Sequence, residues 1–208
     1  EDGRVVYIDN VDDEGPAHAR QVGIQNSDGD YIAFLDADDY WLPDKVEKQL
    51  NFMQENGIKF SYTCYRSIDE NGTNLSCPIL MRDSYNLKQA LVGRGIGILT
   101  IMIEKSLLTN DIIQSRSDFA EDYLWWLLIL NNGHIAKHLD IDSARYRKRN
   151  NSRSKNRFAH QLSLWKIYRG HIQLKLITAF VYYLVYIINV SFSKLRVALC
   201  SRFSKNTA

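Results

Sequence analysis

Residues 31–35 restrict the fold more than any other segment, because this continuous apolar run ends abruptly in three aspartates within residues 36–39. A run of that length and composition is typical of a strand covered on both faces. Such strands belong to α/β layers, whose ligands bind beyond the carboxyl ends of the strands. The sequence therefore predicts that the aspartates stand at a ligand-binding edge of a sheet.

Helices and strands are predicted to alternate along the first two thirds of the chain. Apolar residues at helical spacing predict helices over residues 16–26, 42–57, 86–92 and 121–130. Apolar runs of strand length occur at residues 4–8, 31–35, 59–65 and 98–103. This alternation predicts an α/β architecture with a largely parallel sheet.

Charge is distributed unevenly along the chain. The first 142 residues hold all 24 acidic residues and 12 of the 26 Lys and Arg residues, whereas the last 66 hold 14 basic residues and no acidic one. A basic segment that follows an acidic body indicates an anionic partner for that segment. The total formal charge of +2 excludes a uniformly basic nucleic-acid coat protein.

The segment after residue 155 is predicted to form one or two helices, and residues 176–188 in its middle carry no charge. This stretch is shorter than the ~20 residues that cross a bilayer. Its tyrosines and the basic residues around it better fit a helix that lies in a membrane interface. We therefore expect a body over residues 1–155 and a basic, partly apolar, membrane-associating helical tail over 156–208.

The cysteines Cys64, Cys77 and Cys200 are too far apart in the sequence for a metal knuckle or a redox pair, and their number is odd. We interpret them as reduced thiols of a cytosolic protein. The chain also opens without a basic and then apolar leader, so we expect no signal peptide.

Asp36 and Asp38 are the candidate metal ligands. Carboxylates crowded at a strand end repel one another, and hard oxygen ligands in an open loop favour Mg²⁺ or Mn²⁺ shared with a phosphorylated substrate. Such an ion neutralises a departing diphosphate. The same residues also fit a solvated acidic turn that caps the helix beginning near Pro43, and their spacing alone does not separate the two interpretations.

Glu121 and Asp122 form a second carboxylate pair, at the start of the helix predicted over 121–130. The helix dipole favours acids there and helps to keep Asp122 ionised. Asp122 is a candidate general base for an acceptor hydroxyl, and Trp125 is a candidate stacking surface for a sugar ring. Arg20 is a candidate partner for a nucleotide diphosphate. Each residue also has a purely structural interpretation. The carboxylate pair can simply favour the start of the helix, Trp125 can belong to the core, and Arg20 can be a solvated surface residue.

Four segments in this order resemble the family 2 glycosyltransferases with a GT-A fold: GPAHAR at 15–20, GDYIAFLDADD at 29–39, PDK at 43–45 and EDYLW at 121–125. The resemblance covers about residues 1–155, and the tail resembles bacterial members that build teichuronic acid, O-antigen or capsule-like polymers. Family members open with further strands that end in an Asp-Asp pair. The resemblance thus implies an N-terminally truncated GT-A (nucleotide-diphospho-sugar transferase) fold with a C-terminal helical basic tail.

This resemblance implies an inverting, metal-dependent hexosyltransferase. The enzyme would move a sugar from a nucleotide-diphosphate donor to a saccharide or lipid-linked acceptor in bacterial cell-surface polysaccharide biosynthesis. Asp122 matches the catalytic base, Asp38 the main contact to Mg²⁺ or Mn²⁺, and Asp36 a residue close to both metal and nucleotide. We assign substrate contacts to Arg20, Asp36, Glu121 and Trp125. Residues 146–147 and 152–154 resemble the segment that closes over the donor.

The basic segment is expected to meet two anionic partners. Residues 145–157 would face the sugar nucleotide and the remainder anionic lipid, which places the protein in the cytoplasm, peripheral at the inner face of the bacterial plasma membrane. The alternative is a catalytically incomplete module that binds a membrane surface through its basic C-terminal tail. We expect no nucleic-acid partner: aromatic and basic residues interleave in the tail, but the acidic body would repel a polyanion.

Overall fold

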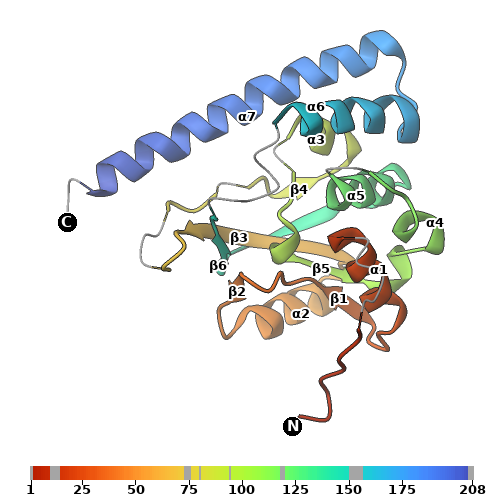
Figure 1. Cartoon of the computed structure of the whole chain (residues 1–208), viewed down its shortest axis with the longest axis vertical. Coiled ribbons are helices and arrows are strands. Elements are labelled where there is room, and N and C mark those ends of the chain that lie inside the picture. Colours follow the sequence, from red (N-terminus) through yellow and green to blue (C-terminus); the bar gives the residue numbers. More distant parts are fainter. Residues whose placement is uncertain are drawn as a thin grey trace.

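The computed structural model describes residues 2–9, 15–72, 76–79, 81–93, 95–117, 120–149 and 157–205. Within these ranges the chain forms one mixed sheet with helices on both faces (Figure 1). The strands are β1 (Tyr31–Ala33), β2 (Tyr40–Trp41), β3 (Phe60–Ile68), β4 (Ser84–Tyr85), β5 (Ile101–Glu104) and β6 (Ala136–Arg147). The α-helices are α1 (Pro16–Gln25), α2 (Lys45–Glu55), α3 (Leu87–Val92), α4 (Asn110–Ile113), α5 (Glu121–Asn131), α6 (Arg157–Lys166) and α7 (Leu176–Lys205).

Strand directions differ from the prediction. The order is β1-β5-β3-β6-β2, with β4 also beside β6, and only β3 and β6 run parallel among the described pairs. The expected largely parallel sheet is therefore wrong. The reason is local: β2 and β4 have two residues each, too few for a periodic signal, and β5 enters the sheet from the 3-10 turn η1 (Ile98–Thr100) to run against both its neighbours.

The predicted helices are confirmed as α1, α2, α3 and α5. Pro16 opens α1, where its missing N–H has no intrahelical partner to lose. At α3 the Asn86 side chain accepts a hydrogen bond from the Gln89 backbone, and the Gln89 side chain accepts one from the Asn86 backbone, 3.0 Å each. This capping box fixes where α3 begins.

Residues 4–8 form no strand, contrary to the prediction. Val5, Val6 and Tyr7 are 76%, 73% and 86% exposed. A strand needs a neighbour for its backbone N–H and C=O groups, and no described strand pairs with this segment.

Helix α2 covers one face of the sheet, whereas α3, α5, α6 and α7 lie on the other side (Figure 1). On that side Trp126 of α5 packs against Phe34 and Phe60, with ring centroids 6.0 and 5.6 Å apart. The same hydrophobic core includes Tyr168, in the π-helical turn η4 (Ile167–His171), and Ala179 of α7. The helices beyond residue 155 therefore share the core of the body.

The face under α2 is held by buried polar groups. Lys45 is 1% exposed, donates to the Gln49 side chain at 2.8 Å and lies 4.2 Å from the centroid of the Trp41 ring. Gln49 in turn donates to the Ser61 hydroxyl at 2.9 Å and to the Thr100 carbonyl at 3.0 Å. Burial lowers the pKa of Lys45 to about 8. This network ties β2, α2, β3 and η1 together.

The cysteines do not all match the expectation of reduced thiols. Cys64 is a free, buried thiol on β3. Cys77 is disulfide-bonded, so the interpretation is wrong for this residue. The side chain of Cys200 lies outside the described part of the structure.

Candidate active site

The acidic loop, residues 36–39, follows β1 after Phe34 and Leu35, because the strand ends at Ala33 and not at residue 35 as predicted. The Asp39 N–H donates to the Asp36 carbonyl at 3.0 Å, which closes the turn. Leu35 is 45% exposed, so the apolar run 31–35 is not covered on both faces as expected. The loop does not cap the following helix, because the N-cap of α2 is Asp44.

Each carboxylate of the acidic loop has a partner from an arginine residue. Arg20 of α1 contacts Asp36 at 2.8 Å, and the Arg149 guanidinium contacts Asp38 at 2.9 Å. The backbone N–H of Arg147 donates to the Asp39 carboxylate at 2.8 Å. Repulsion among the aspartates is thus offset within the chain itself.

Asp39 is the most enclosed of these three aspartates, with 8% of its surface exposed. Burial raises its pKa to about 6, the charges of Asp38 and Asp36 add to the rise, and the hydrogen bond from Arg147 opposes it. An ionised Asp39 at neutral pH therefore costs folding free energy.

Arg147 and Arg149 lie at the acidic loop, in the basic segment that was predicted to face a sugar nucleotide. The Arg147 guanidinium donates to the backbone carbonyls of Asp38, at 2.9 Å, and Glu70, at 2.8 Å. Arg145 instead pairs with Asp142 at 2.6 Å, and residues 152–154 lie outside the described ranges. These partners were missed in the sequence because residues 145–147 were not recognised as the end of strand β6.

Asp122 lies in the first turn of α5, where its carboxylate accepts from the Tyr123 N–H at 2.8 Å. Burial raises the pKa of Asp122; Arg20 lowers it, and Glu121 and Asp36 raise it. The predicted preference for the ionised form is therefore overridden by burial. Arg20 contacts Asp36 at 2.8 Å and its charge also lowers the pKa of Asp122, so the two predicted carboxylate sites share one arginine.

Trp125 does not have the role expected for it. Its side chain is 1% exposed, its indole N–H donates to the Ser115 carbonyl at 3.3 Å, and its ring packs edge-on to Trp126. The ring fills the core, since the helix that carries it is apolar around nearly its whole circumference. Glu121, one turn earlier, is partly exposed beside Asp122.

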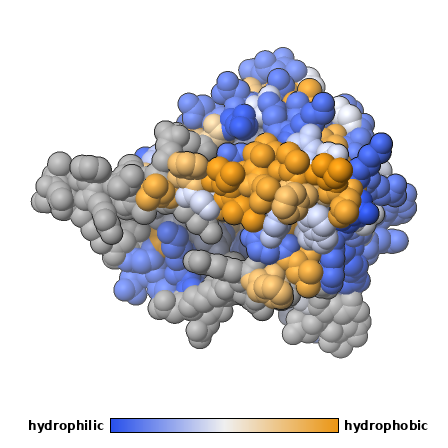
Figure 2. Space-filling view, turned by 90° about the horizontal axis from the view of Figure 1, so that it is seen from above, coloured by the Kyte–Doolittle hydropathy of each residue, from blue (hydrophilic) through white to orange (hydrophobic). Residues whose placement is uncertain are grey.

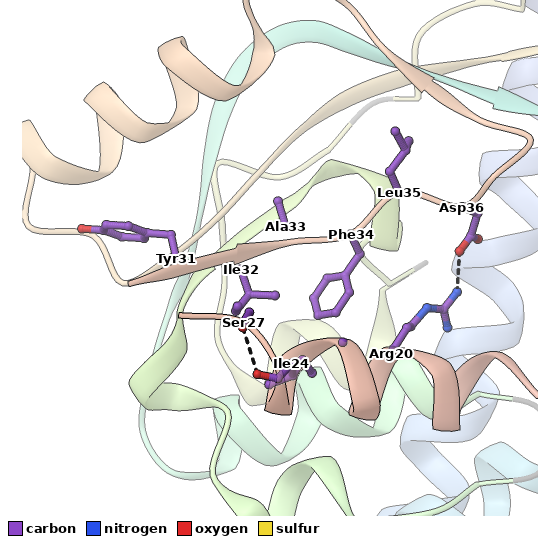
Figure 3. A pocket seen from close by; sticks show the side chains of 10 residues that line it. Arg20, Ile24, Ser27, Tyr31, Ile32, Ala33, Phe34, Leu35 and Asp36 are labelled. Atoms are coloured by element: carbon purple, nitrogen blue, oxygen red, sulfur yellow. Dashed lines mark hydrogen bonds and ion pairs between the residues drawn. The ribbon is translucent and has the colours of Figure 1, made fainter. Parts of the chain in front are cut away.

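A pocket of about 410 Å³ lies between α1 and β1 (Figure 3). Arg20 and Asp36 stand at one end of it, and the sides come from residues 31–35 and from Gly23, Ile24 and Ser27 of α1 and its end. Among the described strands, β1 pairs with β5. The pocket therefore offers a guanidinium and a carboxylate to a ligand.

A mixed sheet with an acidic loop after an edge strand, and a carboxylate-bearing helix beside it, defines the GT-A class of sugar-nucleotide transferases. Similar solved structures include Staphylococcus aureus TarS 1–349 in complex with UDP-GlcNAc (TM-score 0.57, 16% identity, 83% of this chain and 52% of that chain). The complex of TarS 1–349 with UDP matches with a TM-score of 0.55. This likeness establishes the fold.

The sequence profile of Glycosyl transferase family 2 matches residues 1–106. The chain is 37% identical over 165 residues to the putative teichuronic acid biosynthesis glycosyltransferase TuaG of Bacillus subtilis, covering 79% of this chain and 64% of TuaG. It is 31% identical over 194 residues to the Escherichia coli UDP-Glc:alpha-D-GlcNAc-diphosphoundecaprenol beta-1,3-glucosyltransferase WfgD, covering 93% of this chain and 74% of WfgD. The chain belongs to glycosyl transferase family 2.

Proposed function

We propose that the protein is an inverting glycosyltransferase of bacterial cell-surface polysaccharide biosynthesis. It takes a sugar from a nucleotide-diphosphate donor and transfers it to a saccharide or lipid-linked acceptor. The observation that carries the proposal is that Arg20 pairs with Asp36 and its charge also acts on Asp122. In the proposal the Arg20 guanidinium binds the diphosphate, Asp36 belongs to the acidic loop and Asp122 is the base.

Uridine diphosphate sugars are the donor class that the relatives favour. TarS was crystallised with UDP-GlcNAc, and WfgD is named for UDP-Glc and a diphosphoundecaprenol-linked acceptor. In this chain Arg20 stands at the pocket beside Asp36, where a guanidinium is well suited to bind a diphosphate.

Asp122 acts as the general base in this proposal. Its carboxylate takes the proton of an acceptor hydroxyl while that oxygen bonds to the anomeric carbon, and the bond from this carbon to the diphosphate oxygen breaks with inversion. Burial raises the pKa of Asp122, which makes the ionised carboxylate a stronger base, and the charge of Arg20 keeps that form accessible.

The residues of the acidic loop fit a hard divalent cation. Asp36 and Asp38 supply carboxylate oxygens, and these side chains are 42% and 30% exposed, so both are reachable. Oxygen ligands of this kind suit Mg²⁺ or Mn²⁺. When bound, such an ion supplies positive charge to the departing diphosphate.

The catalytic test is transfer of radiolabelled sugar from a panel of UDP-sugars to lipid-linked acceptors in membranes. Asp122→Asn keeps the size of the side chain but removes the base, so turnover should fall by about 10²-fold or more. Asp44→Asn, an exposed carboxylate at the start of α2, is the matched control and should keep its turnover. Unchanged turnover of Asp122→Asn would refute the assignment.

The metal assignment has a separate test, binding of Mn²⁺ measured by calorimetry with and without UDP. Asp38→Asn should weaken binding, whereas Arg149→Gln should strengthen it because the guanidinium competes for the same carboxylate. Equal affinities in the wild type and both variants would exclude Asp38 as a ligand.

Attachment to a membrane surface is the second part of the proposal, and the exposed side of α7 supports it. Ile177, Phe180 and Leu184 are 79%, 53% and 43% exposed, within a hydrophobic band along this helix (Figure 2). By length and composition Leu176–Ser193 is also apolar enough to cross a membrane, with 11% of it buried. Lys166, Arg169 and Lys175 are exposed nearby and suit anionic headgroups.

Point substitutions test this attachment better than deletion of the tail, because Tyr168 and Ala179 belong to the core. The triple variant Ile177→Ser, Phe180→Ser, Leu184→Ser should lose co-sedimentation with anionic vesicles. A control with Val46→Ser and Ile135→Ser, two exposed apolar residues outside α7, should still bind. Vesicle binding without UDP binding or transfer in the wild type would favour the alternative, a catalytically incomplete membrane-surface module.

A further inference from the structure

The parallel strands β3 and β6 change register around Cys64. Thr63 is opposite Leu139, Cys64 opposite Asp142 and Tyr65 opposite Ala144, so β6 carries extra residues on both sides of the Cys64 pair. Bulges of this kind re-aim side chains and occur often beside functional sites. Here the irregularity places side chains of both strands around one thiol.

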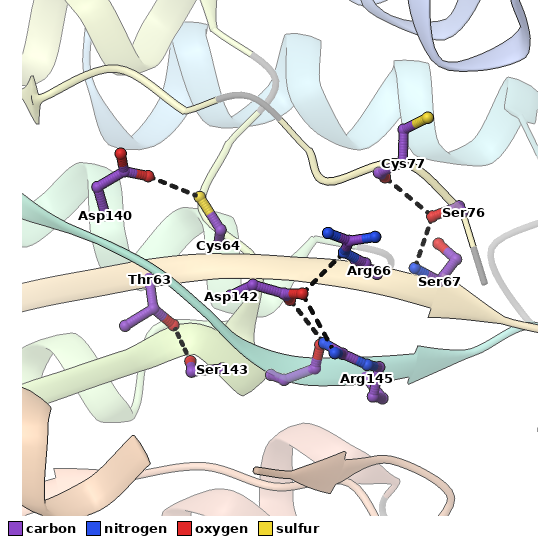
Figure 4. A network of polar contacts seen from close by, with 11 residues as sticks. Thr63, Cys64, Arg66, Ser67, Ser76, Cys77, Asp140, Asp142, Ser143 and Arg145 are labelled. Carbon is purple, nitrogen blue, oxygen red and sulfur yellow. Dashed lines mark hydrogen bonds and ion pairs between the residues drawn. The ribbon is translucent and has the colours of Figure 1, made fainter. Parts of the chain in front are cut away.

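Three potential ligand groups converge at this irregularity. The Cys64 sulfur lies 3.2 Å from His138 Nε2 and 3.7 Å from a carboxylate oxygen of Asp140, and all three ligand atoms lie within 4.8 Å of one another. Figure 4 shows Cys64 and Asp140 on one side of β3, with Thr63 and Ser143 on the other. Cys64 is buried, His138 is partly buried and Asp140 is exposed, so the cluster has a closed inner side and an open outer one.

The surroundings hold the histidine ring in place and are negatively charged. The ring stacks on Tyr62 with centroids 5.2 Å apart, and the His138 backbone N–H donates to the Asp83 carbonyl at 3.0 Å. Burial lowers the pKa of His138, and the negative charges of Asp140 and Asp83 oppose this shift. Orientation by neighbours and a negative field are features that favour a cation at a histidine ligand.

A nucleophilic cysteine is the competing interpretation, since a histidine and a carboxylate also accompany catalytic thiols. Burial, and then the charge of Asp140, raise the pKa of Cys64 to about 11. A reactive cysteine needs an accessible thiolate near neutral pH. The arrangement therefore disfavours nucleophilic chemistry, whereas coordination to a metal deprotonates a thiol directly.

We propose that Cys64, His138 and Asp140 form a binding site for a zinc-class divalent cation. Zn–S bonds of about 2.3 Å and Zn–N or Zn–O bonds of about 2.1 Å at tetrahedral angles place the sulfur about 3.6 Å from the nitrogen and from the oxygen. The observed sulfur–oxygen distance of 3.7 Å matches this separation, and the sulfur–nitrogen distance of 3.2 Å is about 0.4 Å shorter. The open side beside Asp140 leaves room for water as a fourth ligand.

The ligand chemistry separates this site from the acidic loop. Sulfur and imidazole nitrogen select zinc-class ions, whereas carboxylates alone select magnesium-class ions. A metal here would clamp β3 to β6, and β6 carries Arg147 to the acidic loop. The expected effect is a more rigid β3–β6 pair and a higher unfolding temperature.

The test is titration of the chelator-treated, full chain with Co²⁺, which reports its ligands spectroscopically. One equivalent should give a thiolate-to-cobalt charge-transfer band and the absorption of tetrahedral Co²⁺, and Zn²⁺ should displace it. Cys64→Ser should lose the band, and Asp140→Asn should bind at least about tenfold more weakly. His171→Gln, an exposed histidine on η4, is the matched control and should behave as the wild type.

Folding is monitored separately by circular dichroism, and the exposed position of Asp140 keeps the test informative if Cys64→Ser unfolds. Zn²⁺ should raise the unfolding temperature of the wild type by several degrees and leave that of Asp140→Asn unchanged. A wild type without the charge-transfer band, or a band that persists in Cys64→Ser, would overturn the proposal. Asp38→Asn should bind Co²⁺ normally, so failure here is distinct from failure at the acidic loop.

Discussion

Replacement of Asp39 by asparagine should stabilise the protein at neutral pH and much less at acid pH. Burial raises the pKa of Asp39 from 3.8 to about 6. Because the folded pKa is the higher one, the unfolded chain releases this proton first as the pH rises. The stability that protonated Asp39 contributes is fully present below 3.8 and is lost as the pH rises through about 6.

The size of the effect follows from the two pKa values. A pKa shift of about two units means that protonated Asp39 contributes about 3 kcal/mol to the free energy of unfolding, and this contribution is lost by about pH 7.5. About 1.4 kcal/mol of it is lost between about pH 5 and about pH 7.5. Asparagine keeps an oxygen to accept the Arg147 N–H and carries no charge. The stability of Asp39→Asn relative to the wild type should therefore rise by about 1.4 kcal/mol over this interval.

Urea unfolding followed by tryptophan fluorescence, in the presence of EDTA, measures this difference at several pH values. Asp44→Asn is the control, because Asp44 is an exposed acid close in sequence. Its difference from the wild type should stay nearly constant. A difference for Asp39→Asn that does not grow between about pH 5 and 7.5 would refute the reasoning that burial controls this carboxyl.

Three further variants test the packing that supports the site. Burial lowers the Lys45 pKa to about 8. The wild type should therefore gain stability relative to Lys45→Met as the pH rises above about 8, by about 2 kcal/mol near pH 9.5. In the same urea unfolding assay, the stability of Lys48→Met, a change at an exposed lysine, should keep a constant difference from the wild type. Trp126→Ala should cost about 3–5 kcal/mol in urea unfolding, and Trp126→Phe clearly less, because the buried indole N–H has no hydrogen-bond partner. Asn86→Ala removes the cap of α3 and should cost about 1 kcal/mol in thermal unfolding, whereas Asn86→Ser should cost less.

The sequence predicted the elements with strong local signals and missed those fixed by long-range pairing. Helical spacing of apolar residues was sufficient for α1, α2 and α3. Strand β6 has no regular alternation of buried and exposed residues, and β3, β2 and β4 all pair with it. Trp125 shows the same limit at the site: its aromatic ring suggested a sugar surface, but only packing reveals that it faces the core.

The charge asymmetry of the chain shows how pairing changes the interpretation of a sequence. An acidic body and a basic end suggested two separate anionic partners, yet the first arginines after Asp142 meet aspartates of the body. Arg145 contacts Asp142, and Arg147 and Arg149 contact the acidic loop. The exposed basic residues on η4 and at the start of α7 then remain for a membrane surface. If the acidic loop binds a cation with a sugar nucleotide, its arginines are released toward the diphosphate, so cation and donor should bind with positive cooperativity.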